Sequence, residues 1–227
     1  MPAARSRSWN DVLDNLGENL IRLGTSLSVL AETPPGSSSD AAFVQSLEKV
    51  ATGFRLAFRQ ARPALTSGES IFLQLTRASI DELAASHALT GTEHLGRAHT
   101  LVHEGVLVCQ EMVTLLNLIE QGSQSDPEKT RQSFAGSLRH LAETTATAGW
   151  ELRTVCHEFE SEVRLVEFTG AASKILVPVS MGLLHDMANA AQSLRLARRE
   201  WFRVGQRLTS ALGVEAGAPG MLPQTAP

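Results

Sequence analysis

Residues 9–30 read WNDVLDNLGENLIRLGTSLSVL, and this stretch decides the fold. Its large apolar side chains recur at alternating spacings of four and three residues, at Trp9, Leu13, Leu16, Leu20, Leu23, Leu27 and Leu30. Such spacing keeps them all on one side of an α-helix. Because Ser8 is a good N-cap and Thr33-Pro34-Pro35-Gly36 breaks the pattern, we expect a helix from Trp9 to about Glu32 that buries one edge.

The same spacing recurs downstream and predicts further helices. Apolar stripes run through Phe43–Ala61, Leu95–Ile119, Phe134–Phe159 and Leu184–Ala211, the last with a one-step stutter. A less regular helix is expected over 66–89. No alternating run of β-branched residues lies between turn signals, so the sequence predicts no strand.

Asp126-Pro127-Glu128 is a strong helix start, with an N-cap, a proline at the first helical position and an acid just inside. The stripe that follows stays in register, so we expect one helix from Pro127 to about Phe168, roughly 60 Å long at 1.5 Å per residue. Gly149 is the point at which it could bend.

Other breaks are expected around this long helix. Gln121–Gln124 reads as a turn before it, and Gly170-Ala171-Ala172-Ser173 as a break after it. Pro178 is then either the first residue of the last helix or a kink within it.

The fold class that follows is all-α, an antiparallel bundle of five to six helices with at least one of about 35–40 residues. The 227 residues are enough for a single domain, which we place at 9–212. A flexible tail is expected at 1–8 and a disordered tail, rich in glycine, alanine and proline, at 213–227.

Composition excludes several classes of protein. With a net charge of −4 the chain has no overall attraction to nucleic acid. Cys109 and Cys156 lie in apolar helical stretches without CxxC spacing, which favours buried free thiols in a reducing compartment. No apolar segment follows residues 1–8, and the most apolar run, Val106–Ile119, is shorter than the ~20 residues of a membrane span. We therefore expect a cytoplasmic protein.

The sequence offers little catalytic or metal chemistry. His99 and His103 lie four residues apart on one expected helix and are weak candidates for metal ligands, because their imidazoles face the same way. A third and fourth ligand would have to come from another helix. The HExxH, Glu-x-x-His, GxSxG, Walker and dinucleotide-binding motifs are absent from the sequence. We therefore expect no cofactor and find no argument for an enzyme.

Two arginine clusters are the sharper features. Arg55, Arg59 and Arg62 lie on one edge of the second expected helix. The larger cluster lies on the last one and forms our candidate partner or membrane surface, made of Arg195, Arg198, Arg199, Trp201, Arg203 and Arg207. Basic helices with aromatic residues dock on acidic partners or lie on anionic membranes. The alternative is internal, because Glu151, Glu158, Glu162 and Glu167 form an acidic row that could pair with these arginines.

The function that these patterns favour is contact rather than catalysis. We expect a helical-bundle interaction or scaffold protein that binds a protein partner or self-associates, with the unpaired edge of the long helix as one route to a homodimer. A membrane-active or membrane-surface-binding bundle is the alternative, with Val106–Ile119 and Ile175–Leu184 as the segments that could insert. A small-molecule or metal-binding bundle is a further alternative.

Overall fold

The computed structural model of the chain describes residues 9–32, 39–52, 54–55, 90–168 and 181–213. These residues are helical nearly throughout, and none of them forms a strand, which confirms the all-α fold class. Several expectations lie outside the described residues. They are the helix over 66–89, Arg59, Arg62, the break at Gly170–Ser173, the role of Pro178, and the tails at 1–8 and 214–227.

The first helix, α1, spans Trp9–Ala31, as the spacing of its leucines predicts. The ladder residues from Leu13 to Leu27 are at most 2% exposed, so the stripe is the buried edge of the helix. Arg22 pairs with Glu18 on the opposite, exposed side. The apolar stripe therefore marks what α1 buries, as expected.

The helix α3 spans Thr90–Ser125, so it begins before the apolar stripe that was expected to run from Leu95 to Ile119. It continues through Gln121–Gln124, so the expected turn at these residues is wrong. Gly122, inside α3, lies close to the next helix. A side chain at this position would overlap Thr130 of the next helix, so glycine lets that helix pack directly on the end of α3.

The single long helix expected from Pro127 is also wrong, because the chain breaks it into two. The helix α4 spans Pro127–Phe134, and α5 spans Leu138–Phe168. Asp126 caps α4 by accepting a hydrogen bond from the Lys129 amide at 3.1 Å. Between the helices Gly136 has φ of +72°, a left-handed conformation that favours glycine.

The last helix, α6, spans Met181–Leu212, and Gly213 with φ of +64° follows it. Both expected registers are confirmed. Leu184, Met187, Ala191 and Leu194 are buried, and so are Ala197, Trp201, Val204 and Leu208. The stutter between them therefore leaves one continuous apolar stripe along the helix.

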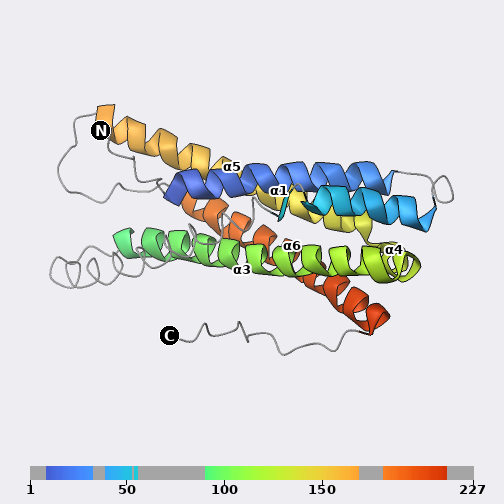
Figure 1. Cartoon of the computed structure of the whole chain (residues 1–227). Helices are drawn as coiled ribbons and strands as arrows, with labels where there is room; N and C mark the ends of the chain where they lie inside the picture. Colours follow the sequence, from blue (N-terminus) through green and yellow to red (C-terminus); the bar gives the residue numbers. More distant parts are fainter. Residues whose placement is uncertain (1–8, 33–38, 53, 56–89, 169–180, 214–227) are drawn as a thin grey trace, which may run out of the picture.

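The helices form two pairs joined through α6 (Figure 1). In the first pair α1 lies along α5 in the opposite direction, because Gly17 meets Gly149 while Gly24 meets Ala142 and Ala146. In the second pair α3 and α6 run the same way. Helix α6 also packs on α5, to which it runs antiparallel, so α3, α5 and α6 alternate in direction along the chain.

Helix also covers residues 40–52 and 54–55, and this segment lies against the ends of α3 and α4. Ser39 caps it, since its Oγ accepts a hydrogen bond from the Ala42 amide at 3.2 Å. Arg55 pairs with Glu120 of α3, and Arg131 of α4 pairs with Asp40 at 2.8 Å. The arginine cluster expected on this helix therefore makes at least one internal ion pair.

One helix in the described part of the chain has the length and composition to cross a membrane, over His99–Ser125. The apolar stretch is longer than the run from Val106 to Ile119 alone suggests. Of its most apolar window, 56% is buried against other helices. Burial of this kind is typical of a core helix.

Candidate interaction surface on helix α6

The outer side of α6 carries four neighbouring side chains that point to solvent, Leu196, Arg199, Phe202 and Arg203, which we call the α6 face. Spacings of three and four place them on consecutive turns of one side. The apolar stripe of α6 faces the opposite way, into the core. The same amphipathic pattern that folds the helix therefore presents this second surface.

Two large apolar side chains remain exposed on the α6 face. Leu196 is 44% exposed and Phe202 is 48% exposed. Arg199 lies between them along the helix, and no acid among the described residues is within ion-pair distance of it. An arginine flanked by exposed apolar groups is a typical composition for a protein interface.

Two of the predicted surface arginines instead hold α6 against α3. Arg195 Nε donates to Glu104 Oε1 at 2.7 Å, and Arg198 Nη1 lies 3.6 Å from Glu104 Oε2. The Glu104 side chain is only 7% exposed. Arg195 therefore hydrogen-bonds one oxygen of a buried acid in the helix contact, and Arg198 lies within ion-pair distance of the other oxygen without a hydrogen bond to it.

The expected internal partners of the arginines were on α5, in the acidic row that begins at Glu151. For Arg195 and Arg198 this expectation is wrong, because their partner Glu104 lies on α3. Spacing along a helix shows which residues share a side, but it does not show which neighbouring helix that side meets.

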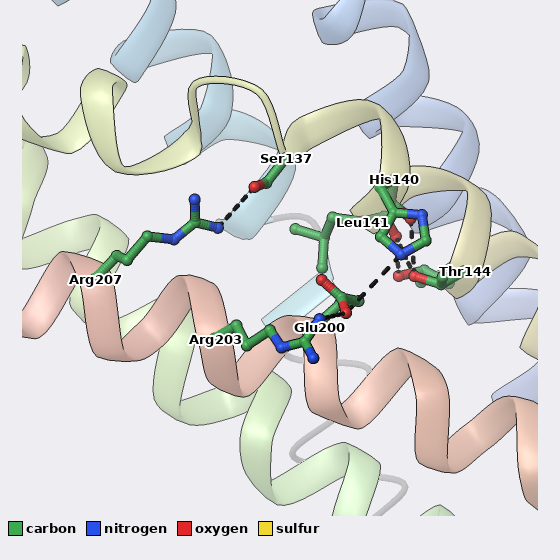
Figure 2. A network of polar contacts seen from close by, with 8 residues as sticks. Ser137, His140, Leu141, Thr144, Glu200, Arg203 and Arg207 are labelled. Carbon is green, nitrogen blue, oxygen red and sulfur yellow. Dashed lines mark hydrogen bonds and ion pairs between the residues drawn. The ribbon is translucent and has the colours of Figure 1, made fainter.

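A network of polar contacts joins the other end of α6 to α5 (Figure 2). Arg203 pairs with Glu200 in its own helix, and His140 Nε2 of α5 lies 3.8 Å from the same carboxylate. Arg207 Nη2 donates to Ser137 Oγ at 2.7 Å, at the start of α5. These contacts fix the register of α6 on α5, while the Arg203 side chain remains 66% exposed.

Trp201 was predicted as part of the surface, and the structure places it in the core. It is 1% exposed, and its indole N–H donates to Thr145 Oγ1 of α5 at 2.9 Å. Successive helical residues point about 100° apart, so the adjacent Phe202 faces solvent while Trp201 does not. Of the predicted surface, the α6 face therefore keeps Arg199 and Arg203 and loses Trp201, while Phe202, which was not predicted as part of it, joins it.

His99 and His103 lie together on α3, as their spacing predicts. Their rings stack with centroids 6.2 Å apart and planes inclined by 17°. The structure describes no group of three or more histidine, cysteine, aspartate or glutamate side chains positioned to hold a metal ion among its described residues. Two imidazoles supply half of a tetrahedral zinc site.

A second surface, on α1 and α5, was not found from the sequence. Trp150 is 59% exposed on α5 and borders an open depression of about 510 Å³. Asp14 of α1 and Arg153 of α5 form an ion pair of 2.9 Å at its edge, and His157 and Glu158 complete its polar wall. The one indication in the sequence was that Trp150 lies off the apolar stripe of its helix. We call this surface the Trp150 depression.

Two side chains, one beside the contact of α3 with α6 and one at the Trp150 depression, have shifted pKa values. Beside the α3 contact, burial raises the pKa of Glu111, and the charge of Arg198 opposes that rise. At the Trp150 depression, the hydrogen bond and charge of Asp14 raise the pKa of Arg153, so this arginine is charged at any ordinary pH.

Comparison with known proteins finds no relative from which a function could be inferred. No family model matches the chain, and neither a curated protein nor a solved structure is significantly similar to it.

Proposed function

We propose that this chain is a non-enzymatic interaction protein that binds a protein partner through the α6 face. The single observation that carries the proposal is the exposure of Leu196 and Phe202, 44% and 48%, on either side of Arg199. A folded domain gains nothing from leaving two large apolar groups in water on one face. Their burial against a partner would contribute binding energy.

The charge of the face indicates the chemistry of the partner. Arg199 and Arg203 would form charge-assisted hydrogen bonds to carboxylates, while Leu196 and Phe202 would fill apolar positions beside them. An acidic amphipathic segment has both properties. The rigid bundle behind the face would reduce the ordering cost of binding, because α6 is already held by α3 and α5.

Site-specific photo-crosslinking tests the proposal in the cells that make the protein. A benzophenone side chain at Gln206, which is exposed one turn beyond Arg203, should form an adduct with another protein chain. The same group at Thr114, exposed on α3, should not. Leu196→Ser with Phe202→Ser should abolish the adduct without changing the unfolding midpoint. Absence of any protein adduct from Gln206 would contradict the proposal.

A membrane surface is the second candidate, and the combination of Phe202 with exposed arginines on one helix face favours it. Flotation with vesicles of phosphatidylcholine and anionic phosphatidylglycerol tests it. Binding at low salt that is lost with Arg199→Glu and Arg203→Glu would support the membrane candidate. Absence of binding at low salt would remove it.

A further inference from the structure

Trp150 is the most exposed of the tryptophan and phenylalanine side chains that the structure describes, and it lies beside a depression. Its exposed fraction of 59% leaves the ring accessible from solvent. Tryptophan is enriched among the residues that dominate binding energy in protein interfaces, and its ring is the preferred aromatic partner of a cation. The chemistry of the site therefore suits a cationic side chain accompanied by apolar groups.

The helices that carry the two surfaces have opposite charge. Helices α1 and α5 together contain nine acidic and four basic residues, a net charge of −5. Helix α6 contains two acidic and five basic residues, a net charge of +3. Two of the nine acids on α1 and α5, Asp14 and Glu158, lie at the Trp150 depression, where Asp14 is paired with Arg153. Complementary potentials of this kind attract two surfaces and orient them.

We infer that the partner of the α6 face is the Trp150 depression of a second copy of this chain. The inference rests on the proposed function, since it needs the α6 face to be a contact surface. The guanidinium of Arg199 would lie over the Trp150 ring of the neighbouring copy, within the ~6 Å at which cation–π attraction acts. Leu196 and Phe202 would cover the rest of the depression.

The geometry of such a contact sets the kind of assembly. Two different surfaces meet, so each copy keeps one α6 face and one Trp150 depression free after pairing. Contacts of this heterologous type continue from copy to copy unless a ring closes. Self-association should therefore increase steadily with protein concentration and weaken with added salt, because salt screens the opposite charges.

Light scattering of the purified full chain over a range of concentrations tests the inference. The average mass of the natural chain should rise above that of a monomer. Trp150→Ala and the double variant Arg199→Glu with Arg203→Glu should each stay monomeric, because each lacks one of the two surfaces. Val29→Ser is the matched control, since Val29 is an exposed apolar residue on α1, and it should associate like the natural chain.

Mixing the two monomeric variants gives the decisive measurement. Trp150→Ala retains its α6 face and the arginine variant retains its depression, so an equimolar mixture should form a complex of two chains and no more. Circular dichroism and unfolding midpoints are the checks that both variants fold. If Arg199→Glu with Arg203→Glu does not fold, Arg199→Gln with Arg203→Gln takes its place.

Three outcomes would overturn the inference. They are a natural chain that is monomeric at every concentration, a variant mixture that stays monomeric, and a variant that still dimerises by itself. The proposed function fails separately, because an adduct from Gln206 to a different protein would uphold it even if self-association were absent. An adduct between two copies of this chain would support both.

Discussion

Among the described residues, Trp201 is the largest of the fully buried side chains, and its one polar group depends on Thr145. The Thr145 hydroxyl accepts the indole N–H at 2.9 Å and donates to the Leu141 carbonyl at 2.6 Å. A buried donor without an acceptor loses its hydrogen bonds to water and gains nothing in return. This pair therefore couples α5 to α6 through chemistry as well as packing.

Thr145→Val tests that coupling, because it keeps the shape of the side chain and removes the acceptor. We expect it to lower the free energy of unfolding by about 1–3 kcal/mol. Thr147→Val, at an exposed position on the same helix, should change stability by less than about 0.5 kcal/mol. Urea unfolding followed by tryptophan fluorescence measures both. Equal effects of the two substitutions would contradict the role of Thr145.

Glu111 gives a prediction about pH. Burial raises its pKa, with Arg198 opposing, so the folded protein binds this proton more tightly than the unfolded chain does. The ionised carboxylate therefore costs stability above the folded-state pKa, and the cost disappears below the unfolded value of about 4.3. Glu111→Gln should be more stable than the natural chain at neutral pH, with no advantage near pH 3. Urea unfolding at both pH values measures this, and an advantage independent of pH would contradict it.

The sequence contained enough to separate Trp201 from Phe202. Trp201 shares a register with Ala197 and Val204, so it belongs to the core stripe, whereas Phe202 is one step away from it. The predicted surface was defined by closeness in the sequence rather than by helical register, so Trp201 was included and Phe202 was not. The exposure of Trp150 was harder to predict, because a residue off one stripe is exposed only if no other helix covers it.

At the scale of helices, the close contact of α1 with α5 depends on small residues. A Cβ on Gly149 would lie 2.5 Å from the Gly17 carbonyl oxygen and 2.9 Å from Ile21. Both contacts involve backbone atoms, which cannot move aside as a flexible side chain would. The glycine that seemed a place for a bend is therefore a place of close approach.

Gly149→Ala should accordingly destabilise the protein, by about 1–3 kcal/mol, because it forces the two helices apart. Gly205→Ala is the matched control on α6, where nothing lies within 4 Å of the added methyl group. Alanine is favoured over glycine in a helix, so this control should stabilise by up to about 1 kcal/mol. Thermal unfolding by circular dichroism compares them. Two shifts of the same sign would contradict the close approach.

The sequence predicted the helix boundaries that have a local cause and missed those that depend on contacts between helices. The start at Asp126 depends on a capping residue and its next turn, so the sequence predicted it. The break at Gly136 was missed because Phe134 and Leu138 stay four residues apart across it, and the apolar stripe continues in step. The turn at Gln121–Gln124 was wrong because its glycine, Gly122, lies within α3 where Thr130 of the next helix approaches it, a contact between two helices that no local pattern shows.

At the scale of the whole molecule, α6 joins the two helix pairs. It packs on α3 and α4 on one side and on α5 on the other, while α1 makes its main contact with α5. The all-α architecture follows from the stripes alone, since each helix must bury one. Which helix packs against which does not follow from the stripes, because several helices have equally apolar stripes and could exchange places. Polar contacts between helices make that choice specific.

Glu104 is the polar contact that sets α6 beside α3, and its removal gives a prediction for the bundle as a whole. Glu104→Gln leaves Arg195 and Arg198 without their acid, although water still reaches both, since their side chains are 40% and 28% exposed. A loss of about 1–2 kcal/mol is therefore expected, less than the ~3–5 kcal/mol for breaking a fully buried pair. Glu143→Gln, at an exposed position, should have almost no effect on the free energy of unfolding.

A double-mutant cycle tests the pairing itself. Arg195→Gln should lower the free energy of unfolding much less in the Glu104→Gln background than in the natural chain, because the partner is already gone. Equal costs of Arg195→Gln in both backgrounds would show that α6 is held on α3 by its apolar stripe alone.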